Sequence, residues 1–205
     1  MAKKAGYALD QSIIAIVEDD RRKLELVRQI EDYIDEFQYE ITSYLSVLSR
    51  RQLSDEVSVE LPVLLHTVND LERVGDHAVN IVEIAERKIE RKLSFSDWAL
   101  TEIEQQRKEV EEMLGYIVEA LENSDIEAAK SALVNERNIN QMQMDFRRSH
   151  VQRMSEGICS AEAGLIFIDL IDNVEKIGDH LTNIAQAIIG GLQWDGIKPK
   201  IADLP

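Results

Sequence analysis

Acidic side chains recur in this sequence at a spacing that suits the binding of a cation. Glu72 and Asp76 lie four residues apart, and Glu175 and Asp179 repeat the pair 103 residues later. Residues four apart lie on one face of a helix, so each pair places two carboxylates side by side. Such carboxylates repel each other unless positive charge lies close to them. A divalent metal ion or a basic side chain would supply that charge.

Both pairs belong to an eleven-residue stretch that occurs twice. It reads LERVGDHAVNI over residues 71–81 and VEKIGDHLTNI over residues 174–184, with six identical positions. No proline occurs between Pro62 and Pro199, so both copies can lie on uninterrupted helices. The face opposite the acidic row is apolar in each copy. Each copy is therefore predicted to be a core helix that carries a row of oxygen donors outward.

A second pair precedes each copy on what is predicted to be the neighbouring helix. Glu31 is followed four residues later by Asp35, and Glu136 is followed by Asn140 at the same spacing. Two helices of one bundle could bring two such pairs together and offer four or more oxygen ligands. That number is enough for a hard cation or for iron.

The same rows have an interpretation that needs no metal. Arg73 and Lys176 stand beside the acidic pairs and could neutralise them, and a duplicated gene copies structural residues as well as ligands. His77 and His180 follow the aspartates by one residue, which turns them about 100° away from the acidic row. They are expected at helix contacts rather than as ligands, and the glycines of the repeat are expected to allow close packing of helices.

The spacing of apolar residues predicts six helices. Ser124 is expected to cap the fifth helix, because Glu127 follows at the spacing of a capping box. The predicted helices cover approximately residues 5–17, 21–50, 55–92, 97–122, 125–154 and 161–189.

The predicted helices fall into two halves with the same order, which indicates an all-α fold of two tandem three-helix bundles related by internal duplication. The halves would span residues 1–92 and 93–190, and an extended tail would follow over residues 191–205. An offset of 105 aligns the early parts of the halves and leaves the first helix about ten residues shorter than the fourth. A late start or a cut from a longer polypeptide would explain this, and the cut is the favoured explanation.

Composition narrows the functional classes. The net charge of −16 argues against nucleic acid as a partner, because phosphate contacts need clustered Lys and Arg. A single cysteine, Cys159, excludes an internal disulfide and suits a reducing cytosol. The sequence lacks an apolar run of about 18 residues, a Glu-x-x-His di-iron motif, a His-Glu-x-x-His zinc motif, phosphate-binding glycine loops and a G-x-S-x-G elbow. It therefore predicts neither a membrane span nor an enzyme.

The doubled Glu-Arg/Lys-x-Gly-Asp-His-x-x-Asn-Ile, with the pairs on the preceding helices, resembles the PhoU family over about residues 5–189. The resemblance implies two similar three-helix bundles packed side by side, and a regulator of phosphate uptake rather than an enzyme. In some members it also implies a multinuclear cluster of iron or another divalent metal. Asn140 departs from the acidic pattern, which puts a full cluster in the second bundle in doubt. The ligands implied by position are Glu31, Asp35, Glu72 and Asp76 in the first bundle and Glu136, Asn140, Glu175 and Asp179 in the second.

The resemblance leaves the setting of the domain open. The favoured assignment is the cytoplasmic C-terminal domain of a bacterial sodium/phosphate cotransporter, with its membrane segments upstream in the same polypeptide. The alternatives are a free-standing regulator of the phosphate ABC transporter and its signalling kinase, or a metal-free helical adaptor. A membrane phosphate transporter is the expected partner, and the expected location is the cytoplasm at the inner face of the membrane. The oligomeric state is open, with a homodimer among the candidates.

Overall fold

The chain forms six α-helices in a computed structural model that describes residues 1–190, without the side chains of residues 55 and 56. No strand occurs in the described range. No helix in this range is long and apolar enough to cross a membrane. The expected extended tail over residues 191–205 lies outside the described residues. The helices are α1 (Ala2–Glu18), α2 (Arg21–Leu48), α3 (Asp55–Glu90), α4 (Asp97–Asn123), α5 (Ile126–Ser155) and α6 (Ala161–Gly190).

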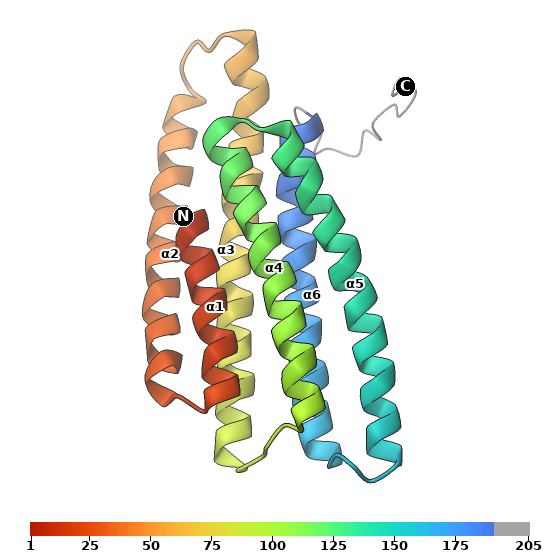
Figure 1. Cartoon of the computed structure of the whole chain (residues 1–205). Coiled ribbons are helices and arrows are strands. Elements are labelled where there is room, and N and C mark those ends of the chain that lie inside the picture. Colours follow the sequence, from red (N-terminus) through yellow and green to blue (C-terminus); the bar gives the residue numbers. More distant parts are fainter. Residues whose placement is uncertain (191–205) are drawn as a thin grey trace, which may run out of the picture.

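The six helices form two three-helix bundles that lie side by side (Figure 1). Helices α1, α2 and α3 pack against one another, and so do α4, α5 and α6. The bundles meet mainly through α3 and α6, and α1 also contacts α4. One hydrophobic core runs through all six helices, because the buried apolar stripes of both bundles join at this contact. The predicted fold class is confirmed.

The internal duplication extends to the turns between helices. Asp19 and Ser124, 105 residues apart, both have left-handed backbone conformation, with φ values of 58° and 53°. Asp20 and Asp125 follow them, and each accepts a hydrogen bond from the backbone N–H two residues on. These aspartates are the N-caps of α2 and α5. The prediction that Ser124 caps the fifth helix was therefore wrong, because Ser124 ends α4 instead.

The glycines of the repeated stretch bring helices close together within each bundle. A Cβ atom at Gly75 would lie 3.2 Å from Cδ1 of Ile34 on α2, and one at Gly178 would lie 3.6 Å from Cγ2 of Ile139 on α5. Both isoleucines are fully buried. The expectation that these glycines serve helix packing is confirmed. The close contact at Gly75 also sets the acidic pairs of α2 and α3 beside each other.

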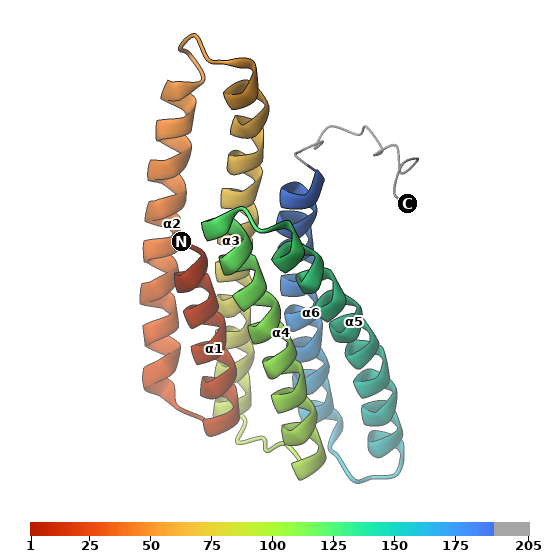
Figure 2. The ribbon, with the colours of Figure 1, turned by 45° about the horizontal axis from the view of Figure 1, so that its top comes forward.

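The bundles differ in the length of their first helix. Helix α1 has 17 residues, whereas α4 has 27. The hairpin of α2 and α3 therefore extends beyond the N-terminus of α1, which is visible from both directions (Figures 1 and 2). In the second bundle, α4 runs along the whole α5–α6 hairpin.

Candidate functional site

The acidic pairs of α2 and α3 lie in one region of the first bundle. The pKa of Glu31 on α2 is raised to about 7, first by burial and then by the negative charges of Asp35 and Asp76. Glu72, which lies on α3 together with Asp76, also raises the pKa of Glu31 by its negative charge. The pKa of Glu72 is itself raised by burial and by Asp76. The carboxyl groups of Glu31 and Asp35 on α2 and of Glu72 and Asp76 on α3 are therefore close enough to repel one another.

One basic side chain lies at the edge of this acidic cluster, which consists of Glu31, Asp35, Glu72 and Asp76. Nη1 of Arg73 donates to Oδ2 of Asp76 at 2.8 Å, and its Nε lies 3.7 Å from Oε2 of Glu72. The guanidinium is largely exposed, so solvent weakens both contacts. A single positive charge beside four carboxyl groups leaves the cluster with a net negative charge.

In the second bundle, the four equivalent side chains make different hydrogen bonds. Nδ2 of Asn140 donates to Oε1 of Glu136 at 2.6 Å, so the pair on α5 satisfies itself by a hydrogen bond. On α6, Nζ of Lys176 lies 2.7 Å from Asp179 and 3.2 Å from Glu175. Hydrogen bonds to Asp179 and then to Glu175 raise the pKa of Lys176. These four positions thus carry three carboxyl groups, one of them bonded to an amide and two bonded to an ammonium.

The two clusters differ in how well they fit a metal ion. In the first, carboxyl groups repel one another at a partly buried position, and a hard cation would relieve that repulsion. In the second, an amide replaces one carboxylate, and Lys176 contacts two others as Arg73 does in the first. Among the described side chains, no three acidic, histidine or cysteine groups converge on one point as metal ligands do. A metal site at the acidic cluster of the first bundle therefore stays a prediction.

The histidines of the repeat lie at the contact between α3 and α6. Nδ1 of His180 is 2.9 Å from Oδ1 of Asp70, and Nδ1 of His77 is 2.9 Å from Oδ1 of Asn173. The two imidazole rings face each other with centroids 5.5 Å apart. Asp70 and Asn173 are equivalent under the offset of 103. The histidine of each bundle therefore contacts the equivalent residue of the other bundle. The prediction that these histidines make helix contacts is confirmed.

The contact between His77 and Asn173 determines which ring nitrogen of His77 carries the proton. Nδ2 of Asn173 donates to the backbone oxygen of Asp169, so its Oδ1 faces His77 as an acceptor. His77 must therefore carry its proton on Nδ1. Burial lowers the pKa of His77, and the hydrogen bond to Asn173 opposes part of this shift. Sequence spacing indicated that the histidines leave the acidic row, but it did not identify Asn173 as a partner.

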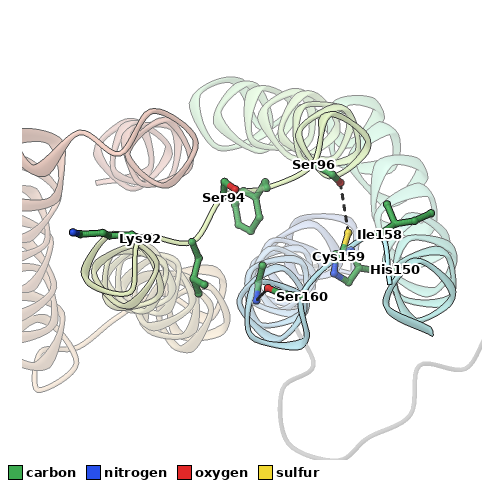
Figure 3. Close-up of a pocket in the computed structure, with 10 residues that line it drawn as sticks. Lys92, Ser94, Ser96, His150, Ile158, Cys159 and Ser160 are labelled. Carbon is green, nitrogen blue, oxygen red and sulfur yellow. Dashed lines mark hydrogen bonds between the residues drawn. The ribbon is translucent and has the colours of Figure 1, made fainter. Parts of the chain in front are cut away.

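A separate cavity of about 360 Å³ lies where the ends of α3 and α5 meet the starts of α4 and α6 (Figure 3). Sγ of Cys159 points to Oγ of Ser96 at 3.8 Å. His150 is 1% exposed and stacks on Phe167, with ring centroids 4.4 Å apart. Its Nε2 lies against α6, 3.1 Å from the point where a Cβ of Gly164 would stand. His150 is thus a packing residue at this junction rather than a partner for the thiol.

The fold and these rows define an internally duplicated, all-helical protein with an acidic row in each half. Residues 1–85 and 103–188 match the PhoU domain. The chain belongs to the PhoU family, as its repeated motif suggested. Because the match extends over both halves, it covers both copies of the acidic row.

Related proteins agree with this assignment. The chain is 27% identical over 172 residues to the "Phosphate-specific transport system accessory protein PhoU homolog 1" of Thermotoga maritima, covering 80% of this chain and 70% of that protein. A Pseudomonas aeruginosa protein, named as a PhoU homolog of the same transport system, is 25% identical over 182 residues, covering 88% and 74%.

Two solved structures share the fold. The crystal structure of PhoU from Pseudomonas aeruginosa has a TM-score of 0.86 at 24% identity, covering 93% of this chain and 91% of that chain. The phosphate transport system regulatory protein PhoU from Streptococcus pneumoniae has a TM-score of 0.81 at 19% identity, covering 93% and 88%. At these identities the likeness establishes the architecture of two helical bundles.

Proposed function

We propose that the chain is a PhoU-type regulator of phosphate transport that acts by contact with a membrane phosphate transporter and not by catalysis. The observation that carries this proposal is the match of both halves to the PhoU domain. Relatives named as accessory proteins of phosphate-specific transport systems support it. They favour a free-standing regulator over the cotransporter domain that the sequence suggested. Contact with such a transporter would place the chain in the cytoplasm at the inner face of the membrane.

The role in transport is tested by uptake of radiolabelled phosphate in the source cells. Cells that lack the gene are expected to lose the restriction of uptake at high external phosphate, and the wild-type gene is expected to restore it. A variant with a disrupted core, such as Ile81→Asp, should fail to restore the restriction because α3 no longer packs. Unchanged uptake in the cells that lack the gene would contradict the proposal.

The acidic cluster of the first bundle is the part of this regulator that would hold iron or another divalent metal. Its like charges at a partly buried position support this assignment, because a cation is the partner that such a field favours. The second row, with Glu136, Asn140, Glu175 and Asp179, would bind metal more weakly. Binding would change the charge that the outer faces of α2 and α3 present to a transporter.

Metal binding is tested with the double substitution Glu72→Ala and Asp76→Ala. Wild-type protein, loaded with Fe²⁺ or Mn²⁺ and desalted, is expected to keep stoichiometric metal by elemental mass analysis. The variant is expected to lose that metal while its helical circular dichroism stays the same. The matched double substitution Glu175→Ala and Asp179→Ala should cost less metal. Equal metal in wild type and the first variant would show that the ligands are assigned wrongly.

A helical adaptor without metal is the second candidate function. It is favoured by the contacts of Arg73 and Lys176, which neutralise part of each row without an ion. The two functions differ in their response to a chelator. A metal-binding regulator should melt at a lower temperature after chelation, whereas the adaptor should melt at the same temperature.

A further inference from the structure

The cavity between the ends of α3 and α5 and the starts of α4 and α6 has an unusual lining for so acidic a chain. It is called the junction cavity here (Figure 3). Its polar lining side chains are Lys92, Ser94, Ser96, His150, Cys159 and Ser160. No aspartate or glutamate is among the described residues that line it, although the chain has 39 acidic residues. Two other cavities on the described surface are lined in part by glutamates, Glu60 in one and Glu109 and Glu112 in the other.

One buried N–H group at this cavity has no hydrogen-bond partner. Nη2 of Arg153 donates to Nδ1 of His150 at 3.2 Å. A guanidinium can only donate, so Nδ1 is an acceptor and Nε2 carries the proton of the neutral ring. Burial and then the positive charge of Arg153 lower the pKa of His150, which favours this neutral form. Nε2 is buried and has no partner within the described part of the chain.

Such a donor requires an acceptor, because a buried N–H group without one costs free energy. Nε2 of His150 lies beside the first turns of α6, at Gly164. The side chain that fills the space at Gly164 is the flexible thioether of Met154. Movement of that thioether would admit an oxygen atom to Nε2.

Two serines that cap helices add further donors to the cavity. Oγ of Ser96 accepts from the backbone N–H of Ala99 at the start of α4, and Oγ of Ser160 accepts from that of Ala163 at the start of α6. Because each oxygen serves its helix as an acceptor, its own hydrogen stays available for donation. The positive ends of two helix dipoles also lie at this junction, and they favour a negatively charged acceptor.

The charged side chains nearby leave this preference in place. Asp97 and Glu162 lie in the first turns of α4 and α6 but do not line the cavity, and Glu162 lies 3.8 Å from Arg91. The ammonium group of Lys92 points away from the cavity (Figure 3). One water takes about 30 Å³ in the liquid, so a cavity of about 360 Å³ has room for a small ion and several waters. Neutral donors beside two helix N-termini suit an ion whose oxygens accept several hydrogen bonds at once.

We propose that the junction cavity binds a small tetrahedral oxyanion, with Nε2 of His150 and the hydroxyl groups of Ser96 and Ser160 as its donors. The site shares no residue with the acidic rows. It goes beyond the proposed function and does not rest on it.

Inorganic phosphate is the probe for this site. The purified full chain is dialysed to equilibrium against radiolabelled phosphate, at constant ionic strength and with a chelator that removes metal from the acidic rows. Saturable binding of one phosphate per chain is expected. Sulfate is expected to displace the phosphate, because the contacts come from hydrogen-bond donors alone. Chloride at the same ionic strength is not expected to displace it.

Ser160→Ala and Ser54→Ala are a matched pair of substitutions. Both serines are exposed helix caps, since Oγ of Ser54 accepts from the backbone N–H of Val57 at the start of α3, but only Ser160 lines the cavity. Ser160→Ala should weaken phosphate binding at least about tenfold, the loss expected for a hydrogen bond to a charged group. Ser54→Ala should bind phosphate as the wild type does.

His150→Phe removes the N–H donor and keeps an aromatic ring on Phe167. It should also weaken phosphate binding at least about tenfold, with the helical circular dichroism of the wild type. If this variant does not fold, the comparison of Ser160→Ala with Ser54→Ala decides.

Four results would overturn the proposal. Without saturable binding to the wild-type chain, water and not an ion satisfies His150. Displacement by chloride as effective as that by sulfate would mean that the ion is held by net charge alone. Equal weakening by Ser160→Ala and Ser54→Ala would assign the effect to helix stability. Unchanged binding in folded His150→Phe would remove the buried donor from the site. None of these results depends on phosphate uptake, so the proposed role in transport stands or fails separately.

Discussion

Neutralising Glu31 should stabilise the metal-free protein at alkaline pH. The pKa of Glu31 is raised from 4.5 to about 7, chiefly by burial and then by the charges of Asp35 and Asp76. A difference of that size corresponds to at most about 3 kcal/mol of unfolding free energy. Solvent reaches part of the side chain and screens the charges, which reduces the expected effect to about 1–2 kcal/mol. Glu31→Gln removes this charge while keeping the shape of the side chain.

The pH dependence has a definite sign. Between pH 4.5 and 7 the folded protein keeps the Glu31 proton, whereas the unfolded chain has lost it. The folded state therefore binds more protons, and its stability falls as pH rises through this window. The advantage of Glu31→Gln over the wild type should be largest above pH 7. At pH 5 it should be less than about a third of that value.

Urea unfolding followed by circular dichroism measures this difference, in buffer with a chelator at pH 5 and at pH 8. Glu40→Gln is the control, because Glu40 is an exposed residue of the same helix. It should change stability by less than about 0.5 kcal/mol at both pH values. If Glu31→Gln is neutral or destabilising at pH 8, burial and the neighbouring charges do not disfavour the ionised form of Glu31 as argued.

Addition of metal should reverse the order of stability. A bound ion at 100 times its dissociation constant stabilises a folded protein by about 2.7 kcal/mol. Mn²⁺ added without chelator should therefore raise the stability of the wild type more than that of Glu31→Gln. An equal rise in both proteins would remove Glu31 from the set of ligands.

Three further predictions concern the helix contacts. Gly75→Ala should destabilise by about 1–2 kcal/mol, because its Cβ would press on the buried side chain of Ile34. Gly178→Ala, where the space is wider, should be neutral or stabilising by up to about 1 kcal/mol in the same urea unfolding measurement. Asp70→Ala should cost about 1–3 kcal/mol, because it removes the acceptor that lies 2.9 Å from His180. A smaller loss at Gly75 than at Gly178, or none at Asp70, would contradict the packing described.

The architecture could be predicted from the sequence because helix formation depends on the local spacing of apolar residues. The internal duplication repeats this spacing in both halves of the chain. The repeated stretch placed Gly75 and Gly178 on equivalent helices, and both glycines do allow close packing. The turn before α5 was harder to predict. Ser124 and Asp125 both suit an N-cap, and only the backbone conformation decides that Ser124 ends α4.

Partners across the bundle contact could not be predicted in the same way. The pairing of His180 with Asp70 spans 110 residues, and periodicity fixes only the face on which a side chain lies. The direction of His77 followed from its place beside the acidic row, but its acceptor on α6 depends on how the two bundles pack.

Two asparagines of the second half stand where the first half has aspartates. Asp35 and Asp70 of the first half correspond to Asn140 and Asn173 in the second. Each asparagine donates a hydrogen bond within its own half, to Glu136 and to the backbone of Asp169. An ionised carboxylate at either position could not donate, so the first half lacks these two hydrogen bonds, and Asp70 instead accepts from His180 and Asn183 of the other bundle. A cation would therefore gain more from the first bundle than from the second.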